Sequence, residues 1–151
     1  MSVTGKLAEL GYELEPMPLQ RRAFHVAVRT GNLVFTSGQL PTLGDVEIKG
    51  AVGGDVDLAT AQKAAEICAF NCLRAVAAVA DLDDVTRAVK VLGLVNCADG
   101  FRDTSSVING ATDLLNAVFG VDNTHARSAV GALLPDNWAV EVELVVELRG
   151  Q

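Results

Sequence analysis

An arginine opens an otherwise apolar run near the end of this chain. In "HARSAVGALLP" (125–135), Arg127 begins a strand-like segment, and Ala129 and Gly131 alternate with it onto one face of that strand. A guanidinium is always charged and matches a carboxylate with two parallel hydrogen bonds. Because its neighbours are small, space remains beside the guanidinium. The pattern is therefore consistent with an anion site for a metabolite that carries a carboxylate.

Two carboxylates follow on the last predicted strand, "WAVEVELVVEL" (138–148). Alternation places Glu141 and Glu143 on one face of this strand and a row of large apolar residues on the other. Either glutamate would serve as a general base or position a water molecule if it were partly removed from solvent. Two alternatives stay open: a solvated strand face, and an ion pair across neighbouring strands between Arg127 and Glu141 or Glu143.

Weaker candidates lie at a strand end and inside a helix. Ser37 and Gly38 end a strand in "FTSGQLP" and offer a hydroxyl and an approachable backbone N–H. Asn109, which Gly110 follows, is locally unfavourable inside its helix, so either a functional role or a tertiary hydrogen bond would explain it. The two histidines are far apart in the sequence. No hydrolytic triad, metal-ligand cluster or cofactor site is predicted.

Hydrophobic periodicity predicts the elements that position these groups. We expect a short helix over 2–11, a polar connector to residue 22 and a hairpin within 24–39 that turns at Gly31–Asn32. Two longer helices are predicted over 58–80 and 104–119, capped by Asp57 and Asp103. The remaining predicted strands are a short edge strand at 46–49 and strands over 86–98, 126–133 and 138–148. This order predicts an α+β fold, a mixed sheet with two helices packed on one face. Residues 1–151 are predicted to form one domain, in which 1–22 are an N-terminal extension with a short helix.

Composition narrows the class of protein. Half of the 151 residues are hydrophobic, more than a monomer of this size needs, which hints at burial between subunits. The net charge of −7 disfavours nucleic-acid binding, and Arg21–Arg22 is the only adjacent basic pair.

Cys68 and Cys72 share a helix face as small core residues. With no signal peptide or apolar membrane span, we expect a cytoplasmic protein with reduced thiols.

Several of these segments together resemble a known family. "GNLVFTSGQLP" (31–41), Asn109, "ARSAV" (126–130) and "VEVELVVEL" (140–148) occur in the order and spacing of the YjgF/RidA family, and the similarity runs from Phe24 to the C-terminus. The variant "FRDTSSVINGA…HARSAVG" is similar to a divergent branch described as YjgF-like or L-PSP endoribonuclease-like. The resemblance implies a chorismate-mutase-like fold and a homotrimer, in which three sheets form a central barrel around three clefts between subunits.

The resemblance also implies an activity and its site residues. Active members hydrolyse enamines and imines such as 2-aminoacrylate to 2-oxo acids and ammonia, without a cofactor. By position, Arg127 matches the arginine that binds the substrate carboxylate, and Glu141 the glutamate associated with the attacking water. The residues that match the rest of the cleft are Phe24, Ser37, Gly38, Asn109 and Ala129.

Departures from the family pattern keep a second function open. Phe24 stands where a tyrosine is common, Ala129 where cysteine is frequent, and Gly131 where many members have glutamate. One residue is missing between Arg127 and Pro135, which leaves both Glu141 and Glu143 as candidates for the water-directing role. The leading hypothesis is an enamine/imine deaminase. The alternative is a non-catalytic trimer that binds a small carboxylate, and the acidic chain counts against the historical ribonuclease label.

Overall fold

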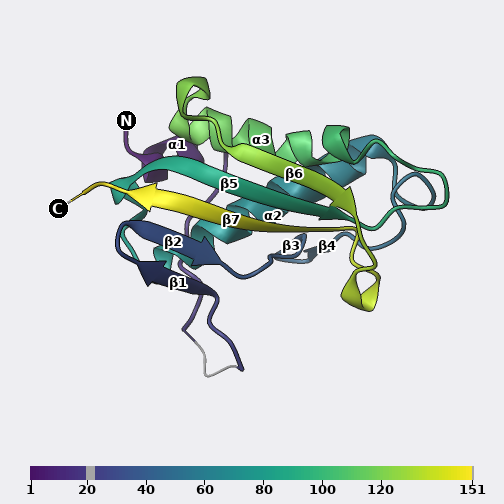
Figure 1. Ribbon diagram of the computed structural model, residues 1–151, viewed down its shortest axis with the longest axis horizontal. Helices are drawn as coiled ribbons and strands as arrows, with labels where there is room; N and C mark the ends of the chain where they lie inside the picture. The colour runs from purple at the N-terminus through teal and green to yellow at the C-terminus, as the bar shows by residue number, and fades with distance from the viewer. Residues whose placement is uncertain (20–22, 151) are drawn as a thin grey trace.

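The computed structural model describes residues 1–19 and 23–150 (Figure 1). Its helices are α1 (Val3–Glu9), α2 (Leu58–Ala77) and α3 (Thr104–Phe119), with single 3-10 turns at Leu82–Asp84, Val121–Asn123 and Pro135–Asn137. Its strands are β1 (Ala27–Thr30), β2 (Leu33–Thr36), β3 (Thr42–Leu43), β4 (Val46–Glu47), β5 (Val85–Val95), β6 (Ala126–Gly131) and β7 (Val140–Leu148). The basic pair Arg21–Arg22 lies outside the described residues.

Five of the strands form one mixed sheet in the order β1-β2-β7-β5-β6. β5 and β6 run parallel and are joined through α3, whereas the other neighbours are antiparallel. β3 and β4 pair only with each other and form a separate two-stranded sheet. Both long helices lie on one face of the five-stranded sheet, behind the strands as drawn in Figure 1. The predicted α+β class with two helices on one face is confirmed.

The two long helices begin where the sequence predicts, whereas α1 covers Val3–Glu9 and is shorter than the predicted 2–11. The carboxylate of Asp57 accepts a hydrogen bond from the Thr60 N–H at 2.8 Å, and that of Asp103 accepts one from the Ser106 N–H at 3.3 Å. Gly120 ends α3 with a φ of 89°. α2 is three residues shorter than the predicted 58–80, because the last amides turn back to the carbonyls of residues 75 and 76 and tighten the final turn.

The strands differ from the prediction mainly at their ends. The hairpin has its two-residue turn at Gly31–Asn32, with Thr30 paired to Leu33. The strand predicted over 126–133 stops at residue 131, and the one predicted from 138 begins at 140. Between them the chain makes a tight 3-10 turn, in which Asp136 and Asn137 adopt positive φ values of 51° and 57°. Such a backbone cannot continue a strand.

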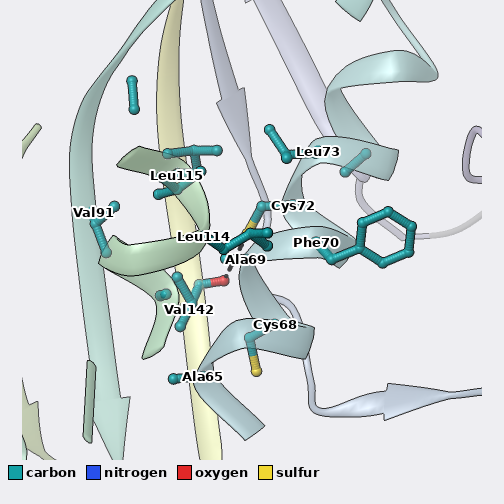
Figure 2. Close-up of a cluster of buried hydrophobic side chains, with 14 of the residues drawn as sticks. Ala65, Cys68, Ala69, Phe70, Cys72, Leu73, Val91, Leu114, Leu115 and Val142 are labelled. Atoms are coloured by element: carbon teal, nitrogen blue, oxygen red, sulfur yellow. Dashed lines mark hydrogen bonds between the residues drawn. The ribbon is translucent and has the colours of Figure 1, made fainter. Parts of the chain in front are cut away.

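The core lies between the helices and the sheet, and its side chains are small along α2. Cys68 and Cys72 are fully buried, as predicted, and the Cys72 thiol donates to the Val142 carbonyl at 3.2 Å (Figure 2). Burial raises the pKa of Cys72 to about 12, so this thiol stays protonated and unreactive. Both cysteines therefore act as packing residues.

Two glycines let α3 approach its neighbours closely. A Cβ on Gly93 of β5 would lie 2.4 Å from the Ile108 side chain, and a Cβ on Gly110 would lie 2.0 Å from the Gln62 carbonyl oxygen of α2. Both positions therefore require glycine for steric reasons. Close contact with α2 also explains why a helix-weakening glycine follows Asn109.

The face of the sheet opposite the helices is partly apolar and exposed. On β7, Val140, Val142, Leu144, Val146 and Leu148 are buried on the helix side, and Glu141, Glu143, Val145 and Glu147 alternate onto the open side, as predicted. Strand pairing adds Val28, Phe35, Leu92, Leu94 and Val130 to that open face. Three of these are large and exposed: Val28, Phe35 and Val130. Exposed apolar side chains gathered on one face are typical of surfaces that bind a partner.

Candidate functional site

Arg127 lies on the helix side of β6, the edge strand, and its guanidinium contacts α3. β6 pairs Arg127 with the buried Val91 of β5, so both side chains point toward the helices. Nη1 donates to Asn109 Oδ1 at 2.8 Å and to Thr112 Oγ1 at 3.0 Å. Nη2 donates to Ser105 Oγ at 2.7 Å and, more weakly, to the Ser105 carbonyl at 3.4 Å. The cation is thus held by neutral oxygens.

The spacing of these three partners follows from the helix. Residues 105, 109 and 112 are four and three apart, so they lie one above another on the same helix face. Gly93 lets Ile108 settle against the sheet, which brings that face within reach of Arg127. Sequence reasoning found Asn109 but missed Ser105 and Thr112. The sequence did contain a signal for both residues, because polar residues at steps of four and three lie along one face of a helix.

The strand order excludes the alternative of an ion pair between Arg127 and Glu141 or Glu143. β5 lies between β6 and β7, so Arg127 is not on a neighbouring strand of either glutamate. Glu141 also pairs with Leu94 on the open face, opposite to the face that carries Arg127. Among the described residues, no carboxylate lies within salt-bridge distance of Arg127.

Ala129 lies two residues after Arg127 and on the same face of β6. Its side chain packs against the core, and its carbonyl accepts a hydrogen bond from Thr104 Oγ1 at 2.8 Å. The start of α3 is therefore tied directly to β6. This bond helps to fix the distance between the strand and the stripe of Ser105, Asn109 and Thr112.

The other predicted site residues line a separate pocket of about 360 Å³ at the end of β2. It includes Phe24, Ser37, Gly38 and Glu141, together with Met17, Val26, Gln39, Leu40, Thr42, Asn71 and Arg74. The Ser37 hydroxyl donates to the His25 carbonyl at 2.6 Å, which closes the chain around the pocket. Phe24 is 63% exposed and forms an apolar part of the wall. The structure thus brings four predicted residues together in one place and Arg127, Asn109 and Ala129 in another.

Glu141, and not Glu143, belongs to this pocket. A Cβ on Gly38 would lie 2.8 Å from Glu141 Oε1, so the absent side chain at Gly38 makes room for that carboxyl group. Partial burial, and secondarily the charge of Glu143, raise the pKa of Glu141. Glu143 is exposed and lies beside Lys90 and Phe35 instead. A carboxylate with a raised pKa accepts a proton more readily than a solvated glutamate does.

Neither a metal-ion cluster nor a membrane-spanning helix is present in the part of the chain that the structure describes. No group of three or more histidine, cysteine, aspartate or glutamate side chains is arranged to hold a metal ion. No helix in residues 1–19 and 23–150 is long and apolar enough to cross a membrane.

Comparisons with known proteins place this chain in a family. The family model described as Endoribonuclease L-PSP matches residues 15–148. Protein TCP17 of Trypanosoma cruzi is 39% identical, over 97% of this chain and 94% of that protein. The crystal structure of Atu1372, a protein of unknown function from Agrobacterium tumefaciens, is 41% identical with a TM-score of 0.86, over 97% and 92% of the two chains.

A more distant structure has the same fold. The YjgF gene product of E. coli shares the fold, with a TM-score of 0.60 and 23% identity over 87% of this chain and 93% of that one. The chain therefore belongs to the Endoribonuclease L-PSP family, also called the YjgF/RidA family.

Proposed function

We propose that this protein is a RidA-like deaminase that hydrolyses small 2-imino and enamino acids to 2-oxo acids and ammonia. The observation that carries the proposal is the arrangement of Arg127, whose guanidinium is oriented by three neutral side chains of α3. Neutral partners fix the geometry of the cation without cancelling its charge. Arg127 is therefore poised to bind the carboxylate of a substrate.

Binding would exchange weaker hydrogen bonds for stronger ones. Hydrogen bonds from a guanidinium to a carboxylate are about twice as strong as those between neutral groups. A substrate carboxylate would therefore replace the hydroxyl oxygens of Ser105 and Thr112 as acceptors. Each hydroxyl can then donate its own proton to the carboxylate, so the two side chains contribute to the anion site in both states.

The Glu141 pocket would supply the general base that the hydrolysis of an imine requires. An enamine first tautomerises to an imine, whose carbon is already electrophilic. Water adds to that carbon while the Glu141 carboxylate accepts a proton from it, and Glu141 passes this proton to the imine nitrogen, which gives a neutral carbinolamine. Glu141 then accepts the proton of the carbinolamine hydroxyl and passes it to the nitrogen, so that the C–N bond breaks, ammonia departs and the carbonyl group of the 2-oxo acid forms. The raised pKa makes the Glu141 carboxylate a better proton acceptor than a solvated glutamate, and Ser37 and Phe24 bound the space in which the imine would lie.

Assembly into an oligomer would bring Arg127 of one copy close to the Glu141 pocket of another. Arg127 and Glu141 lie on opposite faces of the sheet in one protomer, so one chain alone does not place an anchor and a base around the same substrate. We infer a homotrimer, as in the family resemblance, in which Arg127 of one copy approaches the Glu141 pocket of the next. The exposed apolar side chains of the open sheet face, among them Phe35 and Val130, would be buried in that assembly.

The test is ammonia release from freshly generated 2-iminopropanoate. Wild-type protein is compared with Arg127→Ala and with Arg29→Ala, a matched control whose exposed arginine bonds only to the Gly31 carbonyl. We expect Arg127→Ala to lose at least about a hundredfold in kcat/KM, about 2.7 kcal/mol, while Arg29→Ala keeps the wild-type rate. Light scattering verifies that all three proteins remain trimeric. Equal rates for wild type and Arg127→Ala would exclude the proposed role.

A second candidate is a trimer that binds a small carboxylate and catalyses nothing. It is favoured by Phe24, which lines the Glu141 pocket without a hydroxyl group. This function predicts that 2-oxobutanoate raises the melting temperature of wild type but not of Arg127→Ala, and that no imine is turned over above the buffer rate.

The name of the family suggests ribonuclease activity as a third candidate function. The net charge of this chain disfavours it. With a net charge of −7, the protein repels a phosphate backbone unless a local basic patch overcomes that field. RNA cleavage that persisted through repurification and vanished in Arg127→Ala would contradict the deaminase proposal.

A further inference from the structure

The Glu141 pocket contains an arginine, Arg74, that has no part in the proposed reaction. Arg74 of α2 lines the same pocket of about 360 Å³ as Ser37, Gly38 and Glu141. No carboxylate among the described residues, Glu141 included, lies within salt-bridge distance of it. A guanidinium and a carboxyl group that share a pocket without pairing leave room for a ligand between them.

Arg74 is held in place by groups that leave its charge uncompensated. Its Nε donates to the Glu15 carbonyl at 2.8 Å, and its Nη1 donates to Asn71 Oδ1 at 3.2 Å. Asn71 is itself only 2% exposed and is anchored by two hydrogen bonds of 2.9 Å, from Nδ2 to the carbonyls of Leu40 and Thr42. A buried amide with both ends satisfied is a rigid support. Its Oδ1 therefore orients the guanidinium of Arg74 as Asn109 orients Arg127.

The remaining donors of Arg74 suit an anion. Nη2 makes no hydrogen bond to a described residue, whereas Nε and Nη1 are committed. Glu13 and Glu15 line a neighbouring hollow together with Arg74, but neither carboxylate pairs with it. The lining of the same pocket also includes Met17, Phe24 and Leu40, whose apolar side chains would cover the methylene groups of a short aliphatic chain.

We infer that Arg74 binds a second carboxylate, at the far end of the side chain of the substrate. This inference rests on the proposed function: Arg127 of a neighbouring copy would bind the carboxylate next to the imine, Glu141 would direct the water, and Arg74 would bind the distal group. The substrate class is then the 2-imino acids with an acidic side chain, such as those formed by oxidation of aspartate or glutamate. Their products are 2-oxo dicarboxylates.

Equilibrium binding tests this inference separately from catalysis. Titration calorimetry compares 2-oxoglutarate with 2-oxopentanoate, which has the same chain length but no distal carboxylate. For wild type we expect 2-oxoglutarate to bind at least about tenfold more tightly, since a hydrogen-bonded charge pair with an arginine contributes that much. In Arg74→Met the preference should disappear, and Arg74→Lys should keep part of it because the charge remains. Arg29→Met serves as the matched control and should keep the full preference.

The outcomes separate the two proposals. Equal affinity of wild type for both ligands, or an unchanged preference in Arg74→Met, overturns the role of Arg74 even if 2-iminopropanoate is hydrolysed. A preference that depends on Arg74 supports the dicarboxylate site even if no imine is hydrolysed, and in that case only the deaminase proposal fails. Thermal unfolding of Arg74→Met verifies that loss of the Glu15 and Asn71 contacts has not unfolded the protein.

Discussion

Asn109 Oδ1 accepts a hydrogen bond of 2.8 Å from Arg127 Nη1, so a neutral amide orients the cation. An aspartate at position 109 would hold the guanidinium with similar geometry but would neutralise it. The amide at position 109 therefore leaves the charge of Arg127 uncompensated, as an anion site requires, whereas a carboxylate there would form a structural ion pair.

Replacing Asn109 by aspartate should weaken anion binding while it preserves the fold. We expect the Kd for 2-oxobutanoate to rise about fivefold to thirtyfold in Asn109→Asp, about 1–2 kcal/mol, because the new carboxylate competes for Arg127. Calorimetric titration measures the change. Asn116→Asp makes the same charge change elsewhere on α3 and should leave the Kd near that of wild type. An unaltered Kd in Asn109→Asp would show that Arg127 does not bind the anion.

Substituting Gly38 should disturb the glutamate without straining the backbone. Gly38 does not have a positive φ, so alanine is tolerated by the main chain, but its Cβ would lie 2.8 Å from Glu141 Oε1 and Cδ. We expect Gly38→Ala to displace Glu141 and to lower kcat for imine hydrolysis at least about tenfold, with a stability loss of about 1–3 kcal/mol. Gly150→Ala, which meets only Asn32 Nδ2 at 3.6 Å, is the matched control. Full activity in Gly38→Ala would exclude a requirement for this position of Glu141.

The raised pKa of Glu141 predicts how stability depends on pH. Because the folded protein binds this proton more tightly than the unfolded chain does, the contribution of Glu141 to stability falls as pH rises from its unfolded to its folded pKa. Above that window the charged carboxyl carries its full desolvation penalty. We therefore expect Glu141→Gln to stabilise the protein at pH 7 relative to wild type, and less so at pH 4.

Denaturant unfolding at the two pH values measures this difference. Glu143→Gln, at an exposed position on the same strand face, is the comparison. If the gain from Glu141→Gln were the same at pH 4 and pH 7, the pKa of Glu141 would not be raised in the folded protein.

Gly110 should be among the positions least tolerant of a larger side chain. A Cβ there would lie 2.0 Å from the Gln62 carbonyl oxygen, which is main chain and cannot rotate away. We expect Gly110→Ala to cost about 3 kcal/mol or more by forcing α2 and α3 apart. Urea unfolding measures the loss, and Asp113→Ala, at an exposed position of α3, should change stability by less than about 0.5 kcal/mol. A stable Gly110→Ala would mean that the two helices are not in close contact.

Local patterns were sufficient to predict the two long helices, the strands of the five-stranded sheet and the faces of both, but not β3 or its pairing with β4. The alternation of β7, the caps Asp57 and Asp103 and the turn at Gly31–Asn32 each depend on residues a few positions apart, so they can be predicted from the sequence. The predicted ends were less accurate. Where strand 126–133 stops depends on the tight turn at Asp136 and Asn137, whose positive φ values no hydrophobic pattern indicates.

The partners of the site residues could not be predicted in this way. The sequence by itself determined that Arg127 is a cation among small apolar residues, and that Glu141 alternates away from the core. Only the tertiary structure decided that β5 separates β6 from β7, which removes the ion pair between them. It also decided that Ser105 and Thr112 reach Arg127, and that Arg74 shares a pocket with Glu141. The physical reason is that periodicity fixes the face on which a side chain lies, whereas its neighbours depend on the order of strands and the closeness of helices, which are set by packing between distant segments.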